Sequence, residues 1–285
     1  MKLLYVVGLE HSGTTLISHL LSEHKNFVAL GEITAFFSSS HMQQYFDKWG
    51  DHDDVSLCSC GSDWHKCELW SDLIHLSGHN SNVGLLEKYK NLFDYFNEHY
   101  PPDTVIVDSS KSFSTLKLLI DNAQSLGLSR DDISVVFAAK DVRNFANSIA
   151  SKEGASNSLV AHYRSFNWWL GENKKIVSYL ENAEINFHFS FYDVLFTDAD
   201  VLSSKINRFL RECYSAMGYQ TVESSNVNHS NSHIAMGNKN FIMRNRDNIR
   251  YDERWKKSLN LKLVYALHNK AQSFNQLLYQ RSSSA

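Results

Sequence analysis

The sequence predicts an α/β fold of three layers, with helices on both faces of a central, mostly parallel sheet. Short apolar runs rich in Val, Ile and Phe alternate along the chain with longer stretches of helical periodicity. That alternation is typical of βαβ units. The chain has 285 residues, of which 43% are hydrophobic and 21% charged, so it can bury a core without disulfides.

Four apolar runs have the length and composition of buried parallel strands: residues 3–7, 104–107, 133–138 and 185–189. Helical patterns follow most of them, at residues 14–21, 113–126, 143–150 and 159–180, and a further one begins at residue 252. Between residues 31 and 102 both patterns weaken. We therefore expect a single domain over residues 1–285, with an insertion at about residues 33–100 over the carboxyl edge of the sheet. The Ser-rich end, residues 281–285, is expected to be disordered.

Charge and hydropathy exclude several classes of partner. The net charge is −3 and the basic residues are spread along the chain, so we expect no nucleic-acid partner. No apolar run is long enough to suggest a membrane span. The first apolar run leads directly into a glycine-rich loop, which favours a strand over a secretory signal. We therefore expect a cytoplasmic protein whose four cysteines are thiols.

The glycine-rich loop follows the first predicted strand and opens the first predicted helix. Residues 8–15 read Gly-Leu-Glu-His-Ser-Gly-Thr-Thr, which has the G-x-x-x-x-G spacing of a Walker A loop and makes the expected fold P-loop-like. The backbone N–H groups of such a loop and the helix N-terminus form an anion cradle. Thr14 stands where a lysine would reach the phosphates of ATP, which argues against ordinary ATP hydrolysis. The alternative is a plain strand-turn-helix that needs two glycines.

Residues 8–16 resemble the 5′-phosphosulfate loop of sulfotransferases that use 3′-phosphoadenosine 5′-phosphosulfate (PAPS). Further segments are similar to that family in the same chain order. Residues 107–111 resemble its D-S-S-K strand end, 140–148 its R-D-x-R-x-x-x-x-S signature, 191–193 its Y-E-D, and 233–238 with 252–255 the H-x-x-x-G-N and D-x-R-W of bacterial members. Residues 58–70 share a C-x-C-G and C-x-x-W pattern with those members. The resemblance spans nearly the whole chain.

This resemblance implies a sulfotransferase that moves a sulfuryl group from PAPS to a hydroxyl or amine acceptor by in-line displacement, leaving 3′-phosphoadenosine 5′-phosphate (PAP). The acceptor is an unidentified carbohydrate, phenol, lipid or small metabolite, and the insertion would cover its site. No metal is expected. Two other classes stay open, a P-loop kinase or nucleotidase and a non-catalytic PAP-binding module.

The resemblance assigns the 5′-phosphate cradle to the end of the glycine-rich loop: His11, Ser12, Gly13, Thr14 and Thr15. Relatives carry Lys or Arg where this chain has His11. A histidine supplies the same charge only when protonated, and a nearby double anion favours that form. A neutral, hydrogen-bonding His11 is the alternative.

The 3′-phosphate clamp is assigned to Lys140 and Ser148, which have the family's eight-residue spacing with Lys in place of Arg. Lys lacks the bidentate fork of Arg, and Arg143 is expected to compensate. Ser148 could equally be an ordinary residue on a helix surface. Tyr192 resembles the tyrosine near the adenine. A further loop is expected to close over the nucleotide: Gly237, Asn238 and Lys239.

Lys111, Glu32 and His11 are the candidate catalytic residues. Lys111 follows a predicted strand and resembles the lysine that neutralises charge on the transferred sulfonate, although a solvated lysine could occupy such a position. Glu32 follows Gly31 in a setting similar to that of the catalytic glutamate of tyrosylprotein sulfotransferases, which indicates a general base. A structural carboxylate bound to nearby backbone is the alternative.

Cys58, Cys60 and Cys67 cluster in the insertion. A zinc site with His65 as the fourth ligand is one interpretation. The gap between the first two cysteines is shorter than in common zinc motifs, and no second C-x-x-C follows. The pattern therefore favours a local fold element over a metal.

Overall fold

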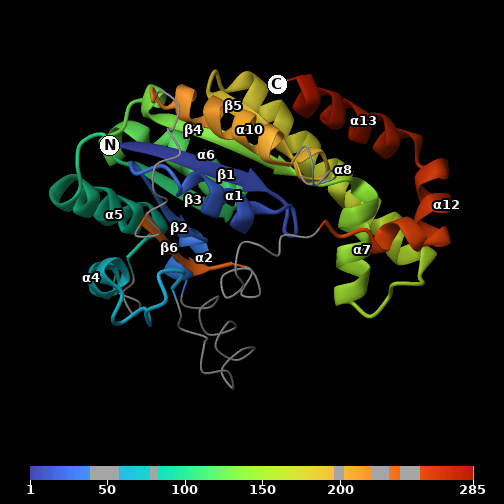
Figure 1. The fold of residues 1–285 in the computed structure, drawn as a ribbon, viewed down its shortest axis with the longest axis horizontal. Helices are drawn as coiled ribbons and strands as arrows, with labels where there is room; N and C mark the ends of the chain where they lie inside the picture. The colour runs from blue at the N-terminus through green and yellow to red at the C-terminus, as the bar shows by residue number, and fades with distance from the viewer. Residues whose placement is uncertain (39–57, 78–82, 196–201, 220–230, 238–250, 285) are drawn as a thin grey trace.

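The computed structural model describes residues 1–38, 58–77, 83–195, 202–219, 231–237 and 251–284. Its centre is a six-stranded parallel sheet in the order β5-β4-β1-β3-β2-β6 (Figure 1). The strands are β1 (Lys2–Gly8), β2 (Phe27–Gly31), β3 (Val105–Lys111), β4 (Ile133–Ala139), β5 (Asn186–Phe191) and β6 (Ser232–Met236). The predicted α/β fold class is therefore confirmed, and the described sheet is wholly parallel.

The α-helices are α1 (Thr14–Leu21), α2 (Ile33–Phe37), α4 (Glu68–Ser77), α5 (Leu85–His99), α6 (Phe113–Asp121), α7 (Val142–Lys152), α8 (Leu159–Asn182), α9 (Tyr192–Leu195), α10 (Leu202–Ala216), α12 (Leu259–Leu267) and α13 (Asn269–Ser284). Short 3-10 turns are η1 (Ala123–Leu126), η2 (Arg130–Asp132) and η5 (Arg254–Lys257). Within the described ranges, none of the helices combines the length and apolar character needed to cross a membrane.

The helices form a layer on each face of the sheet, because alternate strand residues point to opposite faces. Leu4 and Val6 of β1 pack with α1 and α10. Leu3, Tyr5 and Val7 point the other way, into a larger core that includes α5, α6, α7 and α8. Figure 1 shows α12 and α13, in red, lying beside α7 and α8.

The strand order puts the loop after β1 at the point where the chain changes direction across the sheet. The chain passes from β1 to β2 on one side, then returns through β3 and crosses to β4 on the other side of β1. Ligands of open α/β sheets bind at such switch points, outside the carboxyl ends of the strands. The loop, residues 9–13, lies at that edge.

Several sequence predictions need correction. Strands β2 and β6 were not predicted. The helix predicted over residues 113–126 is two elements, because α6 ends at Asp121 and residues 123–126 form the separate 3-10 turn η1. The insertion contains regular helices: α5 buries Tyr89, Leu92, Phe93 and Phe96, a helical spacing.

The C-terminal segment was predicted to be disordered, but α13 continues to Ser284. Ser282 is buried there and its hydroxyl accepts a hydrogen bond from Phe191 N at 3.2 Å.

Candidate active site

The loop after β1 wraps tightly onto the sheet and the start of α1. Gly8 pairs with Ala138 of β4, and Ile17 N donates to Gly13 O at 3.1 Å as the first turn of α1 closes. Gly13 has φ 82°, and a Cβ there would lie 2.6 Å from Cδ2 of Tyr192. Only glycine combines this left-handed backbone with such close packing. The loop therefore has the strand-turn-helix geometry that the Walker-like spacing predicts.

His11 projects from this loop in a half-exposed position and also has a positive φ, 65°. Its Nε2 lies 3.7 Å from a carboxylate oxygen of Glu10. Burial lowers the pKa of His11 below its usual 6.5; Glu10 raises it, while Lys152 and Lys140 lower it. This lowered pKa favours the neutral form of His11.

Lys111 and Glu32 meet at the carboxyl ends of neighbouring strands. Lys111 ends β3 with φ 65° and pairs in register with Val7, the residue before the glycine-rich loop. Its Nζ forms an ion pair with Oε1 of Glu32, which follows β2. The two side chains are 21% and 22% exposed, so both remain open to solvent from one side. The structure thus brings two of the three predicted catalytic residues, Lys111 and Glu32, together beside the loop.

A buried carboxylate fixes the end of β3. Asp108 is fully buried and accepts hydrogen bonds from Tyr89 Oη at 2.6 Å and Ser110 N at 2.8 Å. Burial raises the pKa of Asp108 to about 6. Ser110 Oγ in turn accepts from Thr34 N at 2.8 Å, which ties the start of α2 to this strand end. The backbone on both sides of the Lys111–Glu32 pair is therefore held in place.

Lys140, Ser148 and Tyr192 come together on the other side of the loop. Lys140 follows β4 and is 6% exposed. Its Nζ lies 3.4 Å from Ser148 Oγ and 5.0 Å from the centre of the Tyr192 ring. Burial lowers the pKa of Lys140, while Asp193 and Asp252 raise it. The ring of Tyr192 packs against Gly13, so this group is continuous with the loop.

Arg143 has a different setting from the one predicted. Its Nε and Nη2 donate to the carboxylate of Asp141 at 2.9 and 2.6 Å. The guanidinium carbon lies 4.4 Å from the ring centre of Trp255 and 4.3 Å from that of Tyr265. The guanidinium is thus sandwiched between rings and already holds a carboxylate, so it contributes to packing at the start of α7.

Asp193, for which the sequence predicted no role of its own, lies directly behind the turn that carries Lys140. It is buried and accepts hydrogen bonds from Asp141 N at 2.5 Å, from Asn144 Nδ2 at 3.1 Å and from the hydroxyl of Tyr251. These bonds fix the turn that carries Lys140. The Tyr-Asp pair at residues 192–193 was the available signal, because a polar pair directly after a buried strand lies at the carboxyl edge.

Gly237 brings the end of β6 against α1. A Cβ at Gly237 would lie 2.9 Å from Thr15 Oγ1, so the backbone of Gly237 packs closely against the Thr15 side chain. Ser12, Thr14 and Thr15 are all buried. Asn238 and Lys239, which were predicted to close over a nucleotide, lie outside the described residues.

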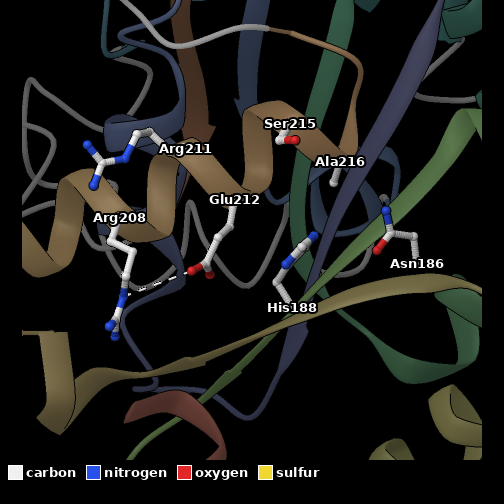
Figure 2. A pocket seen from close by; sticks show the side chains of 7 residues that line it. All are labelled: Asn186, His188, Arg208, Arg211, Glu212, Ser215 and Ala216. Carbon is white, nitrogen blue, oxygen red and sulfur yellow. Dashed lines mark ion pairs between the residues drawn. The ribbon is translucent and has the colours of Figure 1, made fainter. Parts of the chain in front are cut away.

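A separate cavity of about 650 Å³ lies between α10 and β5. Figure 2 shows Arg208, Arg211, Glu212 and His188 around it, with an ion pair of 3.9 Å joining Arg208 and Glu212. Asn186, which starts β5, also lines it, so it opens near the amino end of that strand, opposite the loop. It shares no residue with the predicted site.

No family model matches this chain, and no curated protein matches it. Among solved structures, the chain is similar to the sulfotransferase domain of the olefin synthase from Synechococcus PCC 7002. That likeness covers 95% of this chain and 94% of the other, with 11% sequence identity and a TM-score of 0.48. We draw no functional conclusion from so distant a likeness.

Proposed function

We propose that this protein is a sulfotransferase that transfers a sulfuryl group from PAPS to a hydroxyl or amine acceptor, releasing PAP. The observation that carries the proposal is the Lys111–Glu32 ion pair beside an anion-cradling loop that lacks the Walker lysine. Transfer of a charged group to a neutral acceptor requires a cation at the moving group and a base at the acceptor. Lys111 would supply the cation and Glu32 the base, and the two side chains are in direct contact.

The nucleotide would lie along the loop, with its 5′-phosphosulfate and its 3′-phosphate bound by different groups of residues. Backbone N–H groups of residues 12–15 and the α1 N-terminus would bind the 5′-phosphosulfate, with His11 gaining a proton beside it. Lys140 and Ser148 would bind the 3′-phosphate, since their polar atoms already lie 3.4 Å apart. Tyr192 is placed between these groups and supplies a ring for the adenine side.

The transfer itself would be an in-line displacement. The acceptor oxygen attacks sulfur as the bond from sulfur to the bridging oxygen breaks, and the electrons of that bond stay on the 5′-phosphate of PAP. Lys111 neutralises the negative charge on the sulfonate and bridging oxygen, and Glu32 takes the acceptor proton. In the free protein each side chain binds the other, so donor binding would draw Lys111 toward the sulfonate and leave Glu32 available to the acceptor.

The acceptor would enter over Glu32, where α2 begins. We propose that the insertion predicted from the sequence, at about residues 33–100, covers this side; residues 39–57 and 78–82 of it lie outside the described residues. Phe36, Trp64 and Trp70 from this segment are buried against one another, with ring centres 5.4 and 4.1 Å from Phe36. These aromatic rings form core, so they do not identify an acceptor class.

The test is a screen for PAPS-dependent transfer of radiolabelled sulfur to carbohydrate, phenol, lipid and small-metabolite acceptors, alongside calorimetry with PAP. We expect tight PAP binding and transfer to one of these classes. PAP binding without transfer to any acceptor would favour a non-catalytic PAP-binding module. Tight binding of ATP with Mg²⁺ but not of PAP would favour a kinase or nucleotidase and overturn the proposal.

A further inference from the structure

Three cysteines and one histidine meet at the β6 edge of the described sheet, away from the residues assigned to sulfuryl transfer. Cys58 and Cys60 lie in a tight turn, Cys67 immediately precedes α4, and His233 is the second residue of β6. Their ligand atoms all lie within 4.8 Å of one another. We propose that Cys58, Cys60, Cys67 and His233 form a structural Zn²⁺ site of the Cys₃His type.

The separations of the ligand atoms fit one tetrahedral ion. The Sγ atoms of Cys58 and Cys67 are 3.8 Å apart, and Nδ1 of His233 lies 3.2 Å from Cys67 Sγ and 4.0 Å from Cys58 Sγ. Zn–S bonds of about 2.3 Å and Zn–N bonds of about 2.0 Å put tetrahedral neighbours roughly 3.5–3.8 Å apart. The three separations among Cys58, Cys67 and His233, 3.2–4.0 Å, bracket that range, and Cys60 Sγ, within 4.8 Å of the other ligand atoms, would have to move by up to about 1 Å to complete the tetrahedron.

The backbone around the cysteines is held without help from the thiols. In the turn, Gly61 N donates to Cys58 O and Cys58 N donates to Ser62 O, both at 2.9 Å. Cys67 N donates to Asp63 O at 2.8 Å, and Cys67 O accepts from Ser71 N at 2.9 Å as α4 begins. This turn brings Cys58 and Cys60 to one centre although only one residue separates them. The short gap, which argued against zinc in the sequence, therefore does not prevent both cysteines from binding one ion.

His233 takes the place that the sequence analysis considered for His65. β6 turns its Nδ1 toward the thiols, and its backbone carbonyl accepts a hydrogen bond from Trp70 Nε1 at 2.6 Å. His65 is exposed and belongs to no such cluster within the described residues. The fourth ligand therefore comes from a strand more than 160 positions away in sequence, the separation of Cys67 and His233 being 166.

The chemistry of the ligands selects zinc. None of the described cysteines forms a disulfide, and three of them lie beside one imidazole. Three cysteines and one histidine are a common ligand set for structural Zn²⁺, in which the protein fills all four coordination positions. Cys58, Cys67 and His233 are buried, so water has little access to the metal, and only Cys60 is exposed. Binding converts the three thiols to thiolates and releases their protons.

The site would fasten the turn at Cys58 to the edge strand. Ser59 N donates to Ile234 O at 3.1 Å, and Ile234 N donates to Ser59 Oγ at 2.8 Å, so the turn already covers one side of β6. On its other side β6 pairs with β2. Because Gly237, the residue after β6, lies beside Thr15, the metal would stabilise the strand that borders the proposed nucleotide site. This structural role does not depend on the sulfotransferase proposal.

The experiment measures metal content in the full-length chain produced with zinc in the medium. Mass-spectrometric elemental analysis should find about one zinc per chain in the wild type. Cys60→Ser, which changes an exposed side chain, and His233→Ala should each lose the zinc. His65→Ala is the matched control, an exposed histidine of the same segment, and should keep it.

A second measurement does not depend on how the variants fold. A thiol reagent should modify exposed Cys60 in the native wild type slowly until a chelator is added, and quickly afterwards, because zinc protects its thiolate. Iron in place of zinc, no stoichiometric metal with Cys60 reactive from the start, or a Cys58–Cys67 disulfide in the intact chain would each overturn the proposal. So would full zinc content in both Cys60→Ser and His233→Ala.

Discussion

Lys111 and Glu32 form an ion pair across the carboxyl ends of β3 and β2, with each side chain about one-fifth exposed at 21% and 22%. The pair is held from below, since Asp108 and Ser110 fix the strand that carries Lys111. Oε1 of Glu32 is bound to Lys111 in the free protein. In the proposed mechanism, donor binding would draw Lys111 toward the sulfonate and free this oxygen for the acceptor proton, which would couple the two substrates through these two residues.

Lys111→Ala should lower kcat by about two to three decades while leaving the affinity for PAP nearly unchanged, because the lost charge acts on the transferred sulfonate. Single-turnover kinetics and PAP calorimetry on the same preparation measure the two effects. Lys117→Ala is the matched control, an exposed lysine paired with Asp121 at 2.8 Å, and should leave both unchanged. An unchanged rate in Lys111→Ala would remove this residue from the mechanism.

Lys140→Ala should reduce the preference for PAP over AMP. The wild type is expected to bind PAP more tightly because Lys140 and Ser148 meet only the 3′-phosphate, which AMP lacks. The variant should lose affinity for PAP and change little toward AMP, as calorimetry with both nucleotides would show. Lys175→Ala, an exposed lysine paired with Glu172 at 2.6 Å, serves as the control. Equal wild-type affinities for PAP and AMP would overturn the assignment of this clamp.

The pH dependence of PAP binding tests the charge of His11. Burial lowers the pKa of free His11, and a bound 5′-phosphate would raise it. Binding would then take up a proton, so affinity and activity should fall as pH rises above the free pKa, with affinity falling by up to about tenfold per pH unit.

His11→Arg should keep activity and remove this dependence, since arginine is always charged. The phosphates of PAP titrate in the same range, so the informative quantity is the ratio of the two proteins' affinities at each pH. A constant ratio would indicate that His11 binds as a neutral donor. A folded but inactive His11→Arg would indicate the same.

The pH dependence of stability should report Asp108. Burial raises its pKa from 3.8 to about 6, so the native state holds a proton that the unfolded chain has already lost within that window. The stabilising contribution is fully present below 3.8 and is lost as pH rises through about 6. Its size is about 3 kcal/mol. Asp108→Asn does not titrate, so urea unfolding should show a flatter dependence between these limits; identical profiles would contradict the prediction.

The fold was predictable where local pattern and final environment agree. Residues 3–7 and 133–138 are apolar apart from Ser134, because the strands they form are buried on both faces. β6 was missed because its sequence, Ser-His-Ile-Ala-Met, includes two polar residues whose partners are distant in sequence. Ser232 meets Ser59 at 2.8 Å, and His233 meets Cys67 at 3.2 Å. No local window contains those contacts.

In the candidate site too, the local sequence placed residues on elements but did not give their distant contacts. Lys111 is the last residue of β3, Lys140 and Tyr192 directly follow β4 and β5 in the structure, and each stays a predicted site residue. Arg143, predicted to compensate for Lys140, has a carboxylate partner two residues away, and its ring neighbours come from the C-terminal region. Sequence spacing places a side chain on an element; it does not determine which partner the side chain takes.

Glu32 is the residue on which the proposed mechanism depends most. A base has to be a carboxylate that reaches the acceptor oxygen, and an amide of the same shape cannot replace it. Glu32→Gln still accepts a hydrogen bond from Lys111 but cannot take a proton, so kcat should fall by roughly 10²–10⁴. PAP affinity and the melting temperature should barely change.

Glu172→Gln is the control, because Glu172 is also paired with a lysine but lies on the surface of α8, and it should retain full activity. If Glu32→Gln instead melts at a much lower temperature and keeps its turnover per folded molecule, Glu32 is a structural partner of Lys111. The base would then be sought among the histidines of the insertion: His41, His52 and His65. His41 and His52 lie outside the described residues. A bell-shaped pH profile that loses its acidic limb in Glu32→Gln, with no such loss in any of the three histidine variants, would instead assign the proton transfer to Glu32.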